Sequence, residues 1–451
     1  MRTIEEMVAL AREAQRRWAD ADQARVDAAV KAMARAVFDN AEKLARIAVD
    51  ETGMGVYEDK VAKNRNKARI LWASVRGKKT VGVIARDEES GIVQIAKPMG
   101  VVAAVAPCTN PIVTPMCNGM FAVKGRNAVI FAPHPRAIRS MAAFVEVVLE
   151  AWRELVMPES LIQYAAAPSV ETTRALMAAV DIIVATGGMG MVRSAYGSGK
   201  PAYGVGAGNV QCIVDRGVDL DAAAAKIIEG RRFDNGIICS GEQSVIVPKE
   251  LRGAMAAALA RHGAAVIGEP AGREKLLAAL FVDGQINRAT VGVTAERVAE
   301  LAGVAIPKCT KVIVVDGDGS AATSLLRREK MCPVMAMFTY GTIEEAIAIA
   351  RMNLNLEGKG HSVSIHSENI ENIEKVGLAL PVSRVVVNQP CSTSSGGSFY
   401  NGFAPTTTLG CGTWGNNIIS ENLDYKHLIN ITRIGLRPKD PRVPSDEELW
   451  D

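Results

Sequence analysis

The feature that most constrains the fold is a recurring order of apolar runs, polar or glycine-rich turns and helices. Residues 101–107 (VVAAVAP) lead into CTNP, residues 127–133 (NAVIFAP) into HPR, and residues 181–186 (DIIVAT) into GGMG. Strand, turn and helix in repetition are typical of a doubly wound parallel sheet. The sequence therefore predicts an α/β fold.

The turns after these strands carry the first candidate binding residues. In open parallel sheets, ligands bind beyond the carboxyl ends of the strands. The residues at these ends are Asn110, His134, Arg136, Thr186, Gly187 and Gly188, and we expect them at one crevice. The glycine runs at 187–190 and 204–209 (GVGAGN) are weak signals alone, because neither has the GxGxxG spacing of a dinucleotide fingerprint.

The remaining segments complete two lobes and a hairpin. At 451 residues the chain is long enough for two or three subdomains. Two helical segments are expected in the first 75 residues, broken at the glycines of GMG (53–55). Two β-prone runs at 80–84 and 91–96 predict a hairpin that could serve as an oligomer contact. Alternating strands and helices after residue 242 predict a second α/β lobe.

Composition excludes several classes of protein. A net charge of +3, with no block of lysine and arginine, argues against nucleic-acid binding. The eight cysteines show no CxxC pair and no paired spacing with histidine, so neither a metal site nor a disulfide framework is expected. No apolar run approaches the ~18 residues of a membrane span, and the N-terminus reads as an amphipathic helix. We expect a cytoplasmic protein with reduced thiols.

One thiol stands in a segment suited to a nucleophile. Cys239 lies within residues 233–244 (FDNGIICSGEQS), between Gly236 and Gly241. The glycines permit a sharp turn and the close approach of a ligand. Taken alone, the residue is better interpreted as a buried cysteine that packs as a small hydrophobe.

Six short segments decide between these interpretations by their order along the chain. They are TNP at 109–111, FAPHPRA at 131–137, ATGGMGMV at 185–192, SGKPAYGVGAGN at 198–209, FDNGIIC at 233–239 and LGCGTWG at 409–415. In this order they make the chain resemble the CoA-acylating branch of the aldehyde dehydrogenase superfamily, including the aldehyde half of bifunctional aldehyde/alcohol dehydrogenases. The resemblance runs from the first helix to about residue 433.

The resemblance implies two Rossmann-like lobes with a small β oligomerisation hairpin. Its boundaries place a dinucleotide-binding domain at 1–78 and 98–232, and a catalytic domain at 233–426. The hairpin and a C-terminal tail occupy 79–97 and 427–451. A homodimer or homotetramer is expected.

The resemblance also implies a catalytic pair. Cys239 would attack the aldehyde as a thiolate, while the Asn110 side chain and the Cys239 backbone N–H would stabilise the oxyanion. From the sequence TNP alone, Asn110 could instead be a turn residue before Pro111. Hydride transfer to the nicotinamide would leave a thioester on Cys239.

The fate of this thioester separates two branches of the family. Hydrolytic relatives carry a glutamate base in a GluLeuGlyGly segment, whereas the matching residues 203–208 (YGVGAG) contain no carboxylate. Coenzyme A, whose thiol is the stronger nucleophile, would therefore take the acyl group. The alternative is a hydrolytic enzyme with Glu242 as base; we interpret Glu242 as structural.

The resemblance assigns the remaining site residues. His361 would lie near the mouth of the active site and assist deprotonation of the CoA thiol, unless it is a solvated loop histidine. Glu329 would bind the nicotinamide ribose, with Thr186, Gly187 and Gly188 beside the dinucleotide. His134 and Arg136 would lie near the adenosine ribose, where Arg136 could bind the 2′-phosphate of NADP. Relatives with the same HPR sequence use NAD, so either cofactor fits.

A serine-rich segment bears on the substrate. Residues 391–400 (CSTSSGGSFY) offer hydroxyl and backbone N–H groups at Ser394, Ser395 and Gly396 that could hold an anionic head group. Sulfoacetaldehyde is the leading candidate, with acetaldehyde or propionaldehyde open if this segment is a flexible loop. A different class of function, a catalytically idle oligomer or filament subunit, also stays open.

Overall fold

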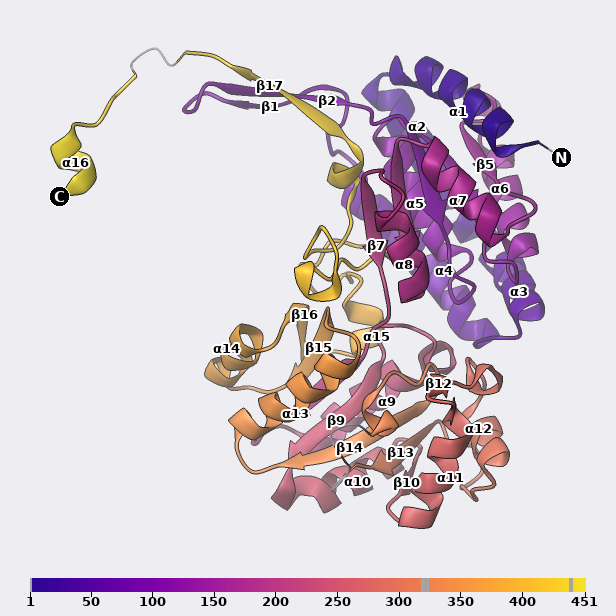
Figure 1. Cartoon of the computed structure of the whole chain (residues 1–451), viewed down its shortest axis with the longest axis vertical. Helices are drawn as coiled ribbons and strands as arrows, with labels where there is room; N and C mark the ends of the chain where they lie inside the picture. The colour runs from indigo at the N-terminus through magenta and orange to yellow at the C-terminus, as the bar shows by residue number, and fades with distance from the viewer. Residues whose placement is uncertain (1, 318–320, 322–323, 438–440) are drawn as a thin grey trace.

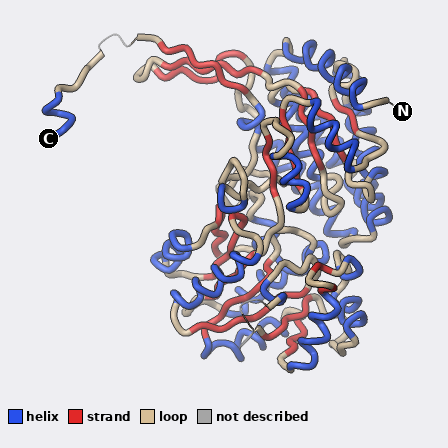
Figure 2. Tube along the Cα trace, viewed as in Figure 1, coloured by secondary structure: helices blue, strands red, loops and turns tan. Residues whose placement is uncertain are grey.

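The structure is a computed structural model that describes residues 2–317, 321, 324–437 and 441–451. Two parallel sheets, each flanked by helices, form two lobes, and a narrow antiparallel sheet extends from the first lobe (Figures 1 and 2). The α/β prediction of two doubly wound lobes and a small β hairpin is confirmed.

The first lobe is built on a five-stranded parallel sheet of order β5-β4-β3-β6-β7. Its strands are β3 (Val101–Val105), β4 (Ala128–Ala132), β5 (Ile162–Tyr164), β6 (Ile182–Thr186) and β7 (Ala202–Val205). All residues of β3 and β4 are buried, because helices cover both faces of the sheet. The turns after β3, β4 and β6 therefore share one edge of the lobe.

Eight helices accompany this sheet in the described residues. They are α1 (Ile4–Ala19), α2 (Gln23–Asp39), α3 (Ala41–Thr52), α4 (Tyr57–Val75), α5 (Val113–Lys124), α6 (Ile138–Ala151), α7 (Val170–Ala179) and α8 (Met189–Tyr196). The expected break at residues 53–55 is confirmed by Gly53, which ends α3 with φ 65°. Three helices rather than one precede it, since Asp22 caps α2 by accepting a hydrogen bond from the Arg25 N–H.

The second lobe holds a seven-stranded parallel sheet of order β10-β13-β14-β9-β8-β15-β16. Its strands are β8 (Val210–Val214), β9 (Glu242–Pro248), β10 (Ala264–Ile267), β13 (Val312–Asp316), β14 (Val334–Tyr340), β15 (Gly360–His366) and β16 (Val382–Val387). Its helices are α9 (Leu220–Arg232), α10 (Arg252–Arg261), α11 (Pro270–Leu280), α12 (Ala295–Ala302), α13 (Ile343–Leu356), α14 (Ile370–Ala379) and α15 (Cys391–Ser394). A short pair, β11 (Phe281–Val282) and β12 (Gln285–Ile286), follows α11.

The chain passes from the first sheet to the second before β8 (Val210–Val214), earlier than the domain boundary expected at residue 232. Strand β8 pairs with β9 and β15, so β8 and the following α9 lie in the second lobe. An apolar strand carries no local signal of which parallel sheet it joins, because that choice depends on its tertiary neighbours.

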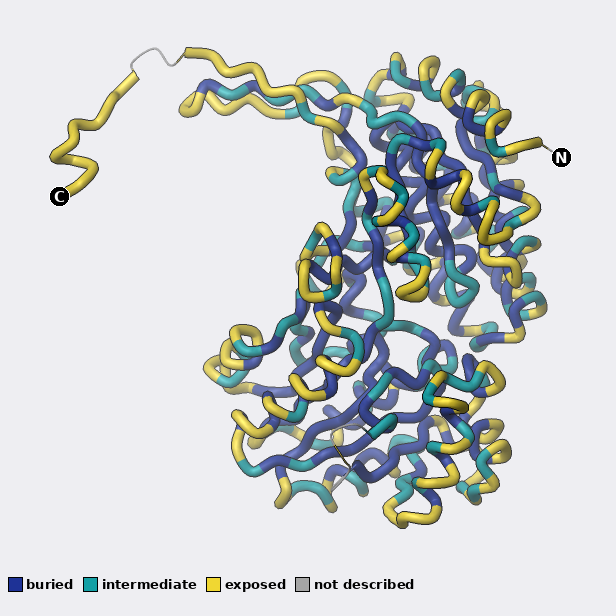
Figure 3. The backbone as a smooth tube through the Cα atoms, in the orientation of Figure 1, coloured by how far each residue is buried: buried dark blue, intermediate teal, exposed yellow. Residues whose placement is uncertain are grey.

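The third sheet forms an arm, defined as β1 (Gly82–Asp87), β2 (Ile92–Lys97) and β17 (Asn430–Gly435). Antiparallel pairing of β17 with β2 joins segments from the two ends of the chain. Buried residues fill the two lobes, whereas most of the arm and the terminal helix α16 (Asp446–Trp450) are exposed (Figure 3). Among the described helices, none combines the length and apolar character that a membrane crossing requires.

Candidate active site

Cys239 lies in the loop that joins α9 to β9. The loop begins with three residues in left-handed conformation, Asp234 (φ 52°), Asn235 (φ 53°) and Gly236 (φ 68°). A Cβ at Gly236 would lie 2.7 Å from the Cys332 backbone, so the turn requires a glycine there. Cys239 itself is partly exposed, and all eight cysteines are unpaired. The loop thus holds the thiol at the amino end of β9.

The segment without a carboxylate lies directly against Cys239. A Cβ added to Gly208 would lie only 1.8 Å from the Cys239 carbonyl oxygen. Residues 203–208 (YGVGAG) therefore supply close backbone contact to the thiol's loop, and no acid or base.

The surroundings of Cys239 keep its thiol protonated. Burial, followed by Glu329 and Cys411, raises the pKa of Cys239 to about 12, and the Arg384 guanidinium opposes this shift. Arg384, a buried residue of β16, donates hydrogen bonds to the carbonyl oxygens of His361 (2.7 Å) and Gly410 (2.8 Å). The cation is thereby fixed where it favours the thiolate.

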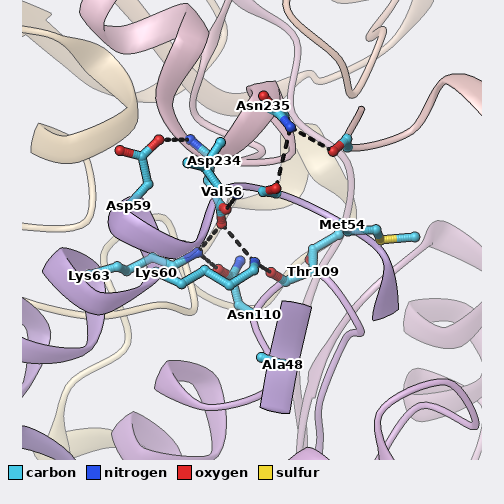
Figure 4. Close-up of polar contacts among 12 residues, drawn as sticks. Ala48, Met54, Val56, Asp59, Lys60, Lys63, Thr109, Asn110, Asp234 and Asn235 are labelled. Carbon is cyan, nitrogen blue, oxygen red and sulfur yellow. Dashed lines mark hydrogen bonds and ion pairs between the residues drawn. The ribbon is translucent and has the colours of Figure 1, made fainter. Parts of the chain in front are cut away.

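Two lysines of α4 bind Asp234 in the Cys239 loop, and one of them, Lys63, connects it to Asn110 (Figure 4). The Lys63 Nζ donates to Asn110 Oδ1 at 2.6 Å and to Asp234 Oδ2 at 2.5 Å. The Lys60 Nζ donates to the same Asp234 oxygen at 3.0 Å. The structure therefore brings the predicted Asn110 into the same polar network as the segment that carries Cys239.

His361 is enclosed in the second lobe. Its side chain is fully buried at the start of β15, with Nδ1 3.1 Å from Ser362 Oγ and no partner for Nε2 among the described residues. Burial, followed by Arg384, lowers the pKa of His361 to about 3. The imidazole is therefore neutral at physiological pH.

The expected dinucleotide residues lie at the edge of the first sheet. Gly187 donates from its backbone N–H to the Val205 oxygen, and Gly188 begins α8. Thr186 Oγ1 lies 3.0 Å from Thr408 Oγ1, which ties this edge to a segment between the lobes. The backbone N–H groups at the start of α8 suit an anionic cofactor such as a dinucleotide.

His134 and Arg136 lie together in the exposed turn after β4. The Arg136 N–H donates to His134 Nδ1 at 3.1 Å, and Arg136 Nη2 donates to the Thr52 oxygen at 2.5 Å. Burial, followed by Arg136, lowers the pKa of His134. The turn presents a cation at the same sheet edge as Thr186.

Glu329 lies close to both Cys239 and Gly208. Burial, followed by repulsion from Glu357, raises the pKa of Glu329 to about 8, although Gly208 and Arg231 oppose this. The carboxyl is therefore protonated at neutral pH and able to donate a hydrogen bond, as binding to a ribose hydroxyl would require.

A cavity of about 360 Å³ lies between residues of the two lobes. It is lined by Met189 and residues 206–207 on the first-lobe side, and by residues 354–359, Cys411 and residues 413–416 on the other. A cleft of this kind between lobes is a common place for a cofactor. Within the described part of the chain, no cluster of three His, Cys, Asp or Glu side chains could hold a metal ion.

The serine-rich segment is ordered and packs beside the nucleophile. Ser394 and Ser395 are buried, and the Ser395 hydroxyl donates to the Cys391 oxygen at 2.9 Å. Ser240, directly after the nucleophile, donates to the Ser392 oxygen at 3.2 Å. The Gly396 oxygen accepts from Lys67 Nζ at 2.8 Å. The segment is thus a fixed wall of the site rather than a flexible loop.

Sequence reasoning missed the charged residues of this site. Lys60, Lys63 and Lys67 are spaced so that they share one face of α4, which is the face toward Asp234 and Gly396. The sequence could have indicated these lysines, because their spacing places them on a helix face whose other residues are buried. Arg384 had no such signal, because a lone arginine in a strand resembles many others.

Comparison with known proteins agrees with this geometry. The family model described as "Aldehyde dehydrogenase family" matches residues 1–427 of the chain. The chain is 52% identical over 448 residues to a succinate-semialdehyde dehydrogenase (acetylating) of Clostridium kluyveri, covering 99% of each chain. It is 41% identical over 417 residues to a sulfoacetaldehyde dehydrogenase of Acholeplasma sp, covering 91% of this chain and 86% of that one.

A solved structure extends the comparison to the fold. The chain superposes on an acetylating aldehyde dehydrogenase from Geobacillus thermoglucosidasius with a TM-score of 0.94 and 36% identity, over 98% of each chain. Both the sequence and the arrangement of the lobes are therefore shared along nearly the whole chain. The protein belongs to the aldehyde dehydrogenase family, in its branch of acylating enzymes.

Proposed function

We propose that the protein oxidises a short aldehyde to an acyl-CoA, with NAD or NADP as hydride acceptor, through a thioester on Cys239. The observation that carries this proposal is the contact of Gly208 with the Cys239 backbone, in a segment that offers no carboxylate to activate water. The use of NAD(P) and coenzyme A agrees with the cofactors of related acylating enzymes.

The residues of the site suit each step of this reaction. Cys239 first loses its thiol proton to solvent. The thiolate then attacks the carbonyl carbon, and the pair of electrons of the C=O bond moves to the oxygen. Asn110 Nδ2 and the Cys239 N–H donate to this oxyanion. The nicotinamide supplies the hydride acceptor when it is bound. As the hydride leaves, the oxyanion pair re-forms the C=O bond, which leaves the acyl group on Cys239 as a thioester.

Glu242 is poorly placed to replace the missing base. Its Oε1 accepts the Cys391 N–H at 2.6 Å, and a Cβ at Gly230 would lie 2.1 Å from its Oε2. The carboxyl is therefore enclosed between α9 and α15. We infer a structural role for Glu242, and a thioester that waits for coenzyme A.

The test compares aldehyde oxidation with and without coenzyme A. The proposal predicts a stoichiometric burst of NAD(P)H without coenzyme A, and steady formation of acyl-CoA with it. Equal steady turnover without coenzyme A, with free acid as the product, would support the hydrolytic alternative. If Cys239→Ala abolishes turnover and the biological role together, the alternative of an idle oligomer subunit is excluded.

The second function proposed for the site is selection of an aldehyde with a terminal negative charge. Lys67 Nζ donates to the Gly396 and Thr406 oxygens at 2.8 and 3.3 Å, and no described carboxylate lies within ion-pair distance of it. Burial lowers the pKa of Lys67 to about 8, so the amine is mainly charged at neutral pH. A cation without an acidic partner, on the Ser394 to Gly396 wall, favours an anionic substrate.

Succinate semialdehyde and sulfoacetaldehyde both carry such a charge, and related enzymes are named for each. We propose succinate semialdehyde first, because the relative named for it is the more similar, and keep sulfoacetaldehyde as the next candidate. Acetaldehyde and propionaldehyde lack the charge. Assays of all four with coenzyme A decide the matter: a preference below tenfold in kcat/KM for the charged aldehydes would remove this role from Lys67.

The cofactor preference and His361 require separate assays. We propose that Arg136 contributes to binding the adenosine end, so Arg136→Ala should change the ratio of kcat/KM for NAD and NADP if a 2′-phosphate is held there. We also propose that His361 assists the CoA thiol, so His361→Ala should slow acyl transfer to coenzyme A more than hydride transfer. Equal slowing of both steps would contradict a role with the CoA thiol.

We propose that the arm joins copies of this chain in a homodimer or homotetramer. Strands β1 and β17 are the two edges of the arm, and most of their residues are exposed. Exposed strand edges pair readily with another chain. Light scattering that gives the mass of a single chain at micromolar concentration would refute this assignment.

A further inference from the structure

We propose that Lys63 is a positioning residue that orients and polarises the Asn110 side-chain amide, so that Asn110 Nδ2 faces the oxyanion formed at Cys239. The inference rests on the proposed function, because the oxyanion arises only if Cys239 attacks an aldehyde. It adds a buried lysine to a catalytic pair that the sequence alone identified as cysteine and asparagine.

The chemistry of the ammonium group decides how the amide lies. A lysine ammonium has three N–H donors and no acceptor. The atom of Asn110 that lies 2.6 Å from Lys63 Nζ must therefore be the amide oxygen. Because the oxygen faces Lys63, the NH₂ group must point the other way. Without this cation, the two ends of the amide could exchange at little cost.

A donor to the amide oxygen also strengthens the amide as a donor. The hydrogen bond from Lys63 draws electron density toward Asn110 Oδ1, which leaves the Nδ2 hydrogens more positive. Charge-assisted hydrogen bonds are roughly twice as strong as neutral ones. Lys63 thereby prepares Asn110 for the moment when negative charge develops on the substrate oxygen.

Lys63 is itself held in place by Asp234. The Lys63 side chain is 8% exposed and that of Asp234 is 0% exposed, and their ion pair is 2.5 Å long. Asp234 Oδ1 accepts the Val56 N–H at 2.9 Å, and the Asp234 N–H donates to Asp59 Oδ2 at 2.8 Å. These contacts hold Asp234 in the left-handed conformation that aims its carboxylate at α4 (Figure 4).

The network also carries an excess of positive charge. Although burial acts to raise it, the pKa of Asp234 is lowered by Lys63 and Lys60, so the carboxylate is ionised. The Asp234 carboxylate faces two lysines, while the second carboxylate of the network, Asp59, lies 3.7 Å from the Arg232 guanidinium. A net positive charge beside Asn110 favours a developing oxyanion, the more so because the groups are shielded from water.

Lys60 provides a matched control within the same network. It is also buried and donates to Asp234 Oδ2, but its nearest contact with the oxyanion turn is the Thr109 backbone oxygen at 3.5 Å. Replacement of Lys60 removes a buried cation from Asp234 without removing a donor from the Asn110 side chain.

The test is a double-mutant cycle on hydride transfer. The rate of the NADH burst at saturating aldehyde and NAD⁺, without coenzyme A, is measured for the wild type, Lys63→Met, Asn110→Ala and the double variant. Loss of one oxyanion donor slows such a step by about 10² to 10³-fold. We expect Lys63→Met to slow the burst at least tenfold in the native background and less than threefold in the Asn110→Ala background. Lys60→Met should slow it by similar factors in both backgrounds.

A second readout separates orientation of Asn110 from activation of the thiol. Alkylation of Cys239 by iodoacetamide forms no oxyanion, so its rate in Lys63→Met should stay within threefold of the wild-type rate. If Lys63→Met does not fold, Lys63→Gln enters the same cycle, with the same criterion of greater loss in the native background.

The outcomes distinguish this inference from the function on which it rests. A wild type without an aldehyde-dependent burst refutes both. A normal wild-type burst with equal losses in the two backgrounds, or with alkylation slowed as much as the burst, refutes the role of Lys63 alone.

Discussion

Replacement of Gly208 by alanine tests whether the close contact with Cys239 sets the geometry of the nucleophile. The new Cβ would lie 1.8 Å from the Cys239 carbonyl oxygen, and the two atoms must separate by about 1.6 Å to reach an ordinary contact of 3.4 Å. The Cys239 oxygen belongs to the backbone and the position of the new Cβ is fixed by the backbone of residue 208, so no side-chain rotation relieves the overlap. Since a displacement of ~1 Å at a reacting group can slow catalysis about 10²-fold, we expect kcat to fall at least that much.

The assay is NADH formation at saturating aldehyde and coenzyme A, together with unfolding in urea. Overpacking of a well-packed contact typically costs about 1–3 kcal/mol, so a loss of stability within that range should accompany the loss of turnover. Gly253→Ala is the matched control, because a Cβ there meets nothing within 4 Å and the residue lies in α10. Turnover of Gly208→Ala within threefold of the wild type would refute the argument from contact.

Three further predictions follow from charged or ionisable groups. Lys67→Met should reduce the preference for a negatively charged over a neutral aldehyde at least tenfold in kcat/KM; an unchanged preference contradicts the anionic-substrate proposal. Burial raises the pKa of Cys239 to about 12, so its alkylation by iodoacetamide without cofactor should accelerate about tenfold per pH unit from pH 7 to 9. A plateau in the alkylation rate near pH 8 would instead show a thiol with a lowered pKa and contradict this prediction. Burial raises the pKa of Glu242 from 4.5 to about 7 in the folded state. Between these two pH values the native protein binds more protons than the unfolded protein, so the free energy of unfolding falls as the pH rises. Glu242→Gln should reduce this slope with CoA-dependent turnover retained, leaving the share that Glu329 contributes. Loss of the turnover with the slope unchanged would contradict a structural role.

The fold was predictable where the signal is local. The apolar runs that became β3, β4 and β6 end at turns whose residue types are visible in sequence, and their parallel arrangement placed Asn110 and Thr186 at one sheet edge. The break at Gly53 followed from the conformational freedom of glycine. Strand β8 was assigned to the wrong side of the lobe boundary, because its partners β9 and β15 lie far along the chain.

The candidate site was only partly visible in the sequence. Cys239 and Asn110 were identified by their motifs, but nothing near them in sequence pointed to Lys63, which is separated from Asp234 by 171 positions. Likewise, the burial of His361 in a central strand could not be read from the text around it. A hydrogen-bonded network depends on which distant segments meet, and that information is spread over the whole fold.

By itself, the sequence determined the fold class, the order of the motifs and the choice of Cys239 as the candidate nucleophile, because strand periodicity, turn chemistry and the absence of a carboxylate in residues 203–208 are local properties of the chain. The tertiary structure alone decided what surrounds that nucleophile. It placed Gly208 against Cys239 and brought the lysines of α4 between Asn110 and Asp234. Desolvation and ion pairing depend on atoms that approach within a few ångströms, whatever their separation in sequence, so the electrostatics of this site exist only in the folded chain.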